Sequence, residues 1–153
     1  MTYIKLVAVI SLILTSCNTN KMDNGLIIKD SPYNVEKTYG KLKNIITNNP
    51  NLKILLELDH SKNALNVDLE LNDTKIIMFG NPKLGTPLMQ VNPTIGIDLP
   101  QKIIVYSNNE KHTKIAYNDP LYLKNRHGID KKDNILETIS KALNTITNKA
   151  IEK

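Results

Sequence analysis

The sequence FGNPKLGTPLMQVNPTIGIDLP, residues 79–100, separates two apolar runs that have the composition of β-strands. The run Lys75–Phe79 leads into this stretch, and the run Lys102–Tyr106 follows it. Pro82 fixes its own φ and disfavours a helical conformation at the residue before it, so the first strand has to end there. We therefore expect two strands joined by a long, structured connection.

Within this connection, Thr86-Pro87 has the form of an N-cap followed by proline at the first helical position. The pattern predicts a short helix over Leu88–Val91 that Pro93 prevents from continuing. A helix N-terminus near the end of a buried strand suits an anion or a carboxylate. The alternative is that Thr86 only caps its own helix.

Upstream of this stretch, the sequence predicts a strand, a helix and a second strand. Leu26–Lys29 is a short apolar run, and Asn34 is a suitable N-cap for a helix whose apolar face begins at Val35. Asn49-Pro50 ends that helix. In the run from Leu52 to Asp59 apolar residues alternate, which predicts one packed face and one wet face. The predicted packed residues are Leu52, Ile54, Leu56 and Leu58.

Downstream, two strands form a predicted hairpin that precedes a short helix and a long one. The loop 108–111 joins Lys102–Tyr106 to Thr113–Tyr117. For the long helix, Asn134 and Glu137 have the spacing of a capping box. Its predicted buried stripe is Leu136, Ile139, Leu143, Ile146 and Ala150. This order favours an α+β fold, with a mostly antiparallel sheet packed on two long helices.

Several separated motifs resemble the domain of unknown function 302 family. They are Asp59-His60, Phe79-Gly80-Asn81-Pro82-Lys83, Gly85-Thr86-Pro87-Leu88-Met89, Asp98-Leu99-Pro100, Tyr117-Asn118-Asp119-Pro120 and Arg126-His127-Gly128. The resemblance spans residues 26–149. It implies a small TATA-box-binding-protein-like β-α-β4-α domain with short inserted helices and a capacity to form a homodimer. It implies no established activity.

The first residues have the composition of a bacterial lipoprotein signal. Lys5 precedes an apolar run of signal-peptide length that ends at Leu14-Thr15-Ser16-Cys17. We expect residues 1–16 to be a signal peptide, Cys17 to be lipidated, 17–25 to be a tether and 26–153 to be a single domain. The predicted location is a bacterial membrane, facing the periplasm or the cell surface. An ordinary cleaved signal, or a short anchor helix with an incidental cysteine, is the alternative.

The composition restricts the classes of partner. The formal net charge is +5, but the lysines are dispersed and no basic run is interleaved with aromatic residues. We therefore expect no nucleic-acid partner. The expected partners are the bilayer through acylated Cys17, an unidentified small ligand or envelope protein, and a second copy of the chain. Cys17 is the only cysteine, so no intrachain disulfide can form.

The sequence carries no strong catalytic signature and predicts no cofactor or resident metal. A soft-metal site of His60, Met89 and His127 is less favoured than structural roles for these residues. The first hypothesis is a non-catalytic domain with a binding cleft at strand ends. The alternative is an envelope hydrolase or metal-assisted enzyme that uses His60 and His127 with Asp59 or Asp98. The candidate cleft residues are His60, Asn81, Thr86, Met89, Asp98, Asn118, Asp119, Arg126 and His127.

Overall fold

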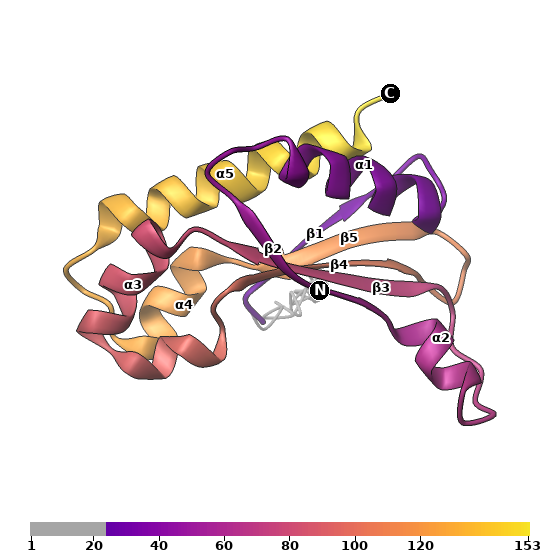
Figure 1. Cartoon of the computed structure of the whole chain (residues 1–153), viewed down its shortest axis with the longest axis horizontal. Coiled ribbons are helices and arrows are strands. Elements are labelled where there is room, and N and C mark those ends of the chain that lie inside the picture. Colours follow the sequence, from indigo (N-terminus) through magenta and orange to yellow (C-terminus); the bar gives the residue numbers. More distant parts are fainter. Residues whose placement is uncertain (1–23) are drawn as a thin grey trace, which may run out of the picture.

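Five strands form one antiparallel sheet in the order β1-β5-β4-β3-β2 in the computed structural model, which describes residues 24–153 (Figure 1). The predicted signal peptide, Cys17 and most of the tether lie outside the described residues. The strands are β1 (Leu26–Asp30), β2 (Lys53–Asp59), β3 (Thr74–Gly80), β4 (Gln101–Ser107) and β5 (Thr113–Asn118). The predicted fold class is confirmed.

Two long helices, α1 (Val35–Thr47) and α5 (Asp133–Ile151), pack on one face of this sheet (Figure 1). Their apolar stripes meet the alternate strand residues that point toward them, because successive side chains of a strand point to opposite faces. The most fully buried side chains of this layer are Leu42 and Ile46 of α1, Leu136 and Leu143 of α5, and Ile77, Ile103, Val105 and Ile115 of the sheet.

The shorter helices lie at the two ends of the strands. The helix α2 (His60–Leu65) follows β2 at one end. The helices α3 (Pro82–Val91), η1 (Pro93–Ile97) and α4 (Pro120–His127) follow β3 and β5 at the other end. In Figure 1, α3 and α4 lie on the left and α2 on the right. β2 and β3 are antiparallel, with Lys53 paired to Gly80 and Asp59 paired to Lys75. The last residue of β2 and the last residue of β3 therefore lie at opposite ends of the sheet.

The predicted alternation of β2 is wrong beyond Ile54, because a β-bulge interrupts the strand. Ile54 lies opposite Phe79, whereas Leu56 lies opposite the adjacent residue of β3, Met78. Leu55 is therefore the extra residue, and the strand faces are inverted after it. Glu57 consequently points toward α1, where its carboxylate accepts a hydrogen bond from the Tyr39 hydroxyl at 2.9 Å. Leu56 turns to the opposite face.

Two predicted helix starts are also wrong. The Asn81 side chain caps α3 by accepting a hydrogen bond from the Lys83 N–H at 2.9 Å, so Thr86 and Pro87 lie inside the helix. Pro82 takes the first helical position that the pattern assigned to Pro87. The helix α5 begins at Asp133, with Lys132 in the N-cap position and no side-chain cap hydrogen bond. The predicted capping box of Asn134 and Glu137 does not form.

The face of the sheet opposite α1 and α5 is apolar. The strand register brings one residue from each strand into a row across it: Ile28, Ala116, Ile104, Ile76 and Leu58. Beside this row, Leu26 and Leu56 are 45% and 46% exposed, and Ile28 itself is 48% exposed. We refer to this surface, formed by Leu26, Ile28, Leu56, Leu58, Ile76, Met78, Ile104 and Ala116, as the open face.

Candidate functional site

An apolar cavity of about 260 Å³ opens beside α3, on the side of the sheet that carries α5. It forms where β2 begins, where β3 ends and where β4 begins, with α5 as its further wall. Most of its lining is aliphatic or aromatic. The apolar side chains that line it are Leu52, Leu55, Phe79, Pro82, Leu84, Met89, Leu99, Pro100, Ile139, Ala142, Leu143 and Ile146.

Local irregularities of the backbone create this space. The bulge directs Leu55, which is 51% exposed, to the cavity instead of into a regular strand row. In α3, Gly85 lines the cavity, and a Cβ added there would meet Leu99 Cδ1 only at 3.8 Å. Pro87 lies inside the same helix and removes one backbone donor. Bulges and irregular helices of this kind are frequent beside functional sites.

Gln101 supplies the buried polar group of the cavity. It is the first residue of β4, lies opposite Phe79 on the helix-covered face, and is only 8% exposed. Among residues 24–153, the structure gives its side-chain amide no hydrogen-bonding partner. No buried side-chain nitrogen or oxygen lacks a partner among the described residues, so the unpartnered Gln101 amide still reaches solvent and is free to bind a ligand atom.

The other polar side chains of the lining are Lys53, Asn81 and Thr86. The side-chain oxygen of Asn81 already caps α3, while Lys53 and Thr86 are exposed. No carboxylate pairs with Lys53 in the part of the chain that the structure describes. Among the described residues that line the cavity there is no aspartate, glutamate or histidine. A mainly apolar lining with few polar groups is typical of small-molecule pockets.

A separate buried cluster joins α4 to η1 and β5 through Asp98 and His127. The His127 Nε2 and Asp98 Oδ2 atoms share a hydrogen bond of 2.6 Å, and their side chains are 6% and 9% exposed. The Asn118 amide donates to Asp98 Oδ1 at 3.4 Å, and Arg126 Nε lies 3.7 Å from Asp98 Oδ2. Neither member of the pair lines the cavity beside α3.

The same imidazole is also held from its other side. His127 Nδ1 lies 2.9 Å from the Thr94 hydroxyl, and the Asn92 amide donates to the His127 carbonyl at 2.7 Å. Asn92 in turn caps η1 by accepting from the Thr94 N–H at 3.0 Å. Because every polar atom of the pair is engaged within the fold, the arrangement acts as a clamp between α4 and η1. We call these residues, Asn92, Thr94, Asp98, Asn118, Arg126 and His127, the Asp98–His127 clamp.

The order of these elements and motifs agrees with a known family. The family described as "Domain of unknown function DUF302" matches residues 27–146. The chain belongs to the DUF302 family. The resemblance inferred from the sequence is thereby confirmed. Four of the residues that carried it, Asp98, Asn118, Arg126 and His127, make up most of the clamp.

Relatives of the chain include longer proteins. Proteins named "Fluoride-specific ion channel FluC 1", from Brucella suis biovar 1 (strain 1330) and Brucella abortus biovar 1 (strain 9-941), are each 32% identical to it over 108 residues. The match covers 71% of this chain but only 42% and 40% of those proteins, so the chain spans about two fifths of their length. Within residues 24–153, none of the helices is long and apolar enough to cross a membrane.

One solved structure shares the fold. It is the crystal structure of an uncharacterized conserved DUF302 protein from Bacillus stearothermophilus, with a TM-score of 0.69 and 20% sequence identity. The similarity covers 83% of this chain and 98% of that one. At this level of identity the likeness establishes the DUF302 fold and nothing about activity.

The predicted cleft residues divide into three groups. The clamp brings together Asp98, Asn118, Arg126 and His127, whereas the cavity is lined by Asn81, Thr86 and Met89. Asp119 belongs to neither, because its side chain caps α4 by accepting from the Leu121 N–H at 3.0 Å. His60, the other member of this third group, is the first residue of α2 at the opposite end of the sheet.

The predicted convergence of His60 with His127 is therefore wrong. Asp59 ends β2 and pairs with Lys75, six residues along β2 from the end where Gly80 and the cavity lie. At about 3.3 Å per strand residue, His60 is roughly 20 Å from the clamp end of the sheet. The soft-metal site of His60, Met89 and His127 does not assemble, and the described residues hold no group of three His, Cys, Asp or Glu able to bind a metal ion.

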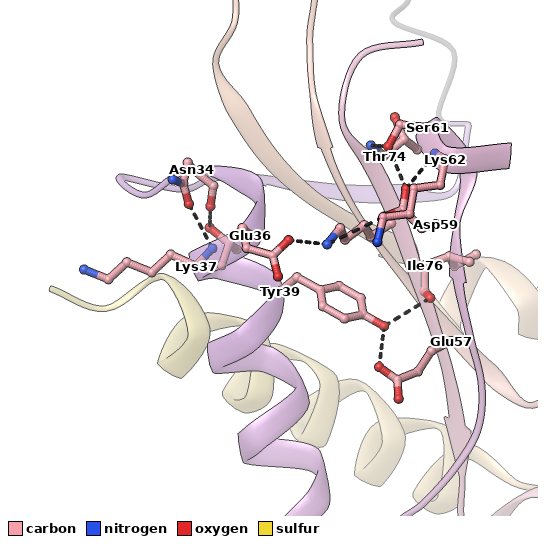
Figure 2. Close-up of polar contacts among 12 residues, drawn as sticks. Asn34, Glu36, Lys37, Tyr39, Glu57, Asp59, Ser61, Lys62, Thr74 and Ile76 are labelled. Carbon is pink, nitrogen blue, oxygen red and sulfur yellow. Dashed lines mark hydrogen bonds and ion pairs between the residues drawn. The ribbon is translucent and has the colours of Figure 1, made fainter. Parts of the chain in front are cut away.

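The end of the sheet that carries α2 has its own polar network, which Figure 2 shows. Lys75 bridges Glu36 of α1 and Asp59, whose Oδ2 lies 3.7 Å from Lys75 Nζ. The Ser61 hydroxyl donates to Asp59 Oδ1 at 2.7 Å, and this bond is the main reason that the pKa of Asp59 is lowered. Burial, and then the hydrogen bond to Glu57, raises the pKa of the Tyr39 hydroxyl. These contacts tie α1 to β2 and β3.

Sequence reasoning missed the residues that give the cavity its character, namely Leu55, Gln101 and the α5 wall. Leu55 was assigned to the wet face because nothing in the alternation indicates the bulge. Gln101 stands beside Pro100 and resembles an ordinary turn residue. The signal that was available is that a polar residue begins an otherwise apolar strand, Gln101–Ser107, whose next inward residues are Ile103 and Val105.

Proposed function

We propose that this DUF302 chain is an exported, lipid-anchored protein whose domain binds a small, largely apolar ligand in the cavity beside α3. The observation that carries the ligand-binding proposal is the Gln101 amide, a polar group that has no partner among the described residues and reaches solvent from an otherwise apolar wall. Ligand sites typically combine an apolar lining with a few polar groups that orient the ligand. Gln101 is such a group, and Lys53 and Thr86 lie at the exposed part of the lining.

Binding is favoured over catalysis at both polar centres. Among the described residues, no aspartate, glutamate or histidine lines the cavity, and the Asp98–His127 pair is held from every side by the fold. The alternative enzyme required His60 beside His127, and these residues lie at opposite ends of the sheet. The channel activity in the names of the Brucella proteins belongs to proteins more than twice as long as the matched region, and we do not transfer it.

Blocking the cavity from the exposed side of α5 tests the proposal. Ala142 is exposed and lines the cavity, so Ala142→Phe adds a ring to the cavity without replacing a core residue. Thr145→Phe places the same ring on an exposed position of α5 that does not line the cavity. Titration with the neutral fluorescent dye N-phenyl-1-naphthylamine should show at least tenfold weaker binding for Ala142→Phe and unchanged binding for Thr145→Phe. Equal binding by both variants would contradict the proposal.

The lipid anchor rests on the sequence before the domain, where Cys17 follows an apolar run of signal-peptide length. A diacylated cysteine would hold the domain durably at a membrane, because each buried methylene contributes about 0.8 kcal/mol. Fractionation of cells that express Cys17→Ala should move the protein from the membrane to the soluble fraction. Membrane retention of the variant equal to that of the wild type would overturn the anchor.

We also propose that the open face is covered by a second copy of the chain. The register places three lysines on this face, Lys53, Lys102 and Lys114, of which Lys114 pairs with Asp30 and Lys102 donates to the Asp98 carbonyl at 3.2 Å. The row of Ile28, Ala116, Ile104, Ile76 and Leu58 itself carries no charge, so two apposed copies would bring apolar rows together. Light scattering should give a dimer for the wild type and a monomer for Ile28→Lys, with Leu121→Lys on exposed α4 remaining dimeric. A monomeric wild type would rule out dimerisation through the open face.

A further inference from the structure

Beyond its apolar lining, the cavity selects ligands by charge. Lys53 is the one charged residue among the described residues of its lining, and the register, which pairs Lys53 with Gly80, directs its side chain to the face of the sheet opposite Phe79 and Gln101. A ligand that carries an ammonium group would find no carboxylate among the described lining residues. An oxygen acceptor, by contrast, would find the Gln101 amide within the wall. The wall therefore complements neutral or anionic groups that contain oxygen.

The size of the cavity limits the apolar part of such a ligand. A volume of about 260 Å³ corresponds to roughly nine water molecules at about 30 Å³ each, which is similar to a chain of eight to ten heavy atoms. The lining contains flexible side chains, including Leu84 and Met89 of α3, that adapt to an unbranched chain.

From these observations we infer that the cavity binds a single acyl chain of medium length, whose carbonyl oxygen accepts a hydrogen bond from the Gln101 side-chain amide. The inference rests on the proposed function, because it names the ligand class of the same cavity. The shared chemistry is an unbranched alkyl chain ending in a carbonyl group. Its source is a free carboxylic acid or an acyl ester of a membrane lipid, and the relative affinities of decanoate and methyl decanoate distinguish the two.

Displacement of N-phenyl-1-naphthylamine from the full chain provides the test. Affinity should rise about fourfold with each methylene from hexanoate to about decanoate, and then level off when the cavity is full. Methyl decanoate should also displace the dye, whereas decylamine should bind at least tenfold more weakly than either. Tighter binding of decanoate than of methyl decanoate would favour the acid as the ligand, and tighter binding of the ester would favour the lipid.

The role of Gln101 is tested with Gln101→Met, which keeps an unbranched side chain of similar length and removes the amide. The variant should weaken decanoate and methyl decanoate about fivefold to tenfold, because one hydrogen bond is lost. Circular dichroism checks that the variant is folded. The matched control is Gln90→Met on α3, an exposed position outside the cavity lining, and it should bind like the wild type.

The failures of the two proposals give different results. If the dye binds and Ala142→Phe blocks it, but neither decanoate nor methyl decanoate displaces it, the acyl-chain inference is wrong and the ligand-binding proposal stands. Decylamine that binds as tightly as decanoate, or Gln101→Met with undiminished affinity for both acyl compounds, would also overturn the inference. If the dye does not bind at all, both proposals fail.

Discussion

At the scale of single residues, the His127 imidazole shows how a chemically suggestive group can be used for structure. Both ring nitrogens have a partner inside the protein, Asp98 Oδ2 at 2.6 Å and the Thr94 hydroxyl at 2.9 Å. Only Thr94 of these three side chains belongs to an exposed residue. The pair thus connects α4 to η1 instead of presenting an imidazole to a substrate.

Removing the imidazole should destabilise the protein strongly. His127→Phe leaves the buried Asp98 carboxylate without its closest partner, and we expect a loss of about 2 to 4 kcal/mol in the free energy of unfolding. Urea denaturation followed by circular dichroism measures this loss. His112→Phe, in the exposed hairpin loop, is the control and should change stability by less than about 0.5 kcal/mol. Similar values for the two variants would show that the clamp contributes nothing.

The carboxylate of Asp59 should make stability depend on pH. Its pKa is lowered in the folded protein, first by the Ser61 hydroxyl and further by the Lys62 N–H and Lys75. A lowered folded pKa contributes stability above the unfolded pKa of about 3.9, and this contribution is lost as the pH falls through the folded pKa. Asp59→Asn keeps the cap of α2 and removes the charge.

The wild type should therefore exceed Asp59→Asn in stability by about 0.5 to 1 kcal/mol at pH 7, and this difference should shrink as the pH falls below the unfolded pKa of about 3.9. Thermal unfolding over this pH range measures the difference. The control is Glu70→Gln, at an exposed position with no ion pair among the described residues, and its difference from the wild type should be small and independent of pH. A gap for Asp59→Asn that persists unchanged at pH 3 would refute this assignment.

At the scale of elements, the positions where prediction failed are the ones that shape the cavity. Two Asx/Thr-Pro pairs compete to begin α3, and the sequence alone favoured Thr86-Pro87. The structure uses Asn81-Pro82, which directly follows β3, so α3 gains an additional turn that forms one wall of the cavity. Local preference allowed both starts, and packing of the helix against the sheet end decided between them.

This choice of cap has a measurable consequence. Asn81→Ala should lower the free energy of unfolding by about 1 kcal/mol, because the Lys83 N–H loses its side-chain acceptor. Thr86→Ala should change it by less than about 0.5 kcal/mol, since Thr86 is an exposed residue inside the helix. Chemical denaturation of both variants measures the two values. The reverse ranking would indicate that α3 begins at Thr86 in solution.

At the scale of the whole molecule, the sequence was sufficient to predict the architecture. Apolar runs, the two helical stripes and the order β-α-β-β-β-β-α predicted the antiparallel sheet covered by α1 and α5. The site was predicted only in part. Asn81, Thr86 and Met89 line the cavity, but Leu55 and Gln101 were missed, because a bulge and a buried, unpartnered amide are properties of three-dimensional packing.

The architecture also explains why one end of the molecule is suited to binding. Residues 81–100 and the bulged start of β2 leave the helix-covered layer incompletely filled there, while α1 and α5 close it elsewhere. The open face and the Asp98–His127 clamp lie outside the cavity, so self-association and stability can be altered without altering the cavity.

Native mass spectrometry of the protein isolated from its own membrane tests the central claim most directly. The account predicts a retained small molecule on the wild type and on Thr145→Phe, and a bare protein mass for Ala142→Phe. An identical bare mass for all three proteins, or an identical adduct on all three, would contradict the claim that the cavity beside α3 is a ligand site.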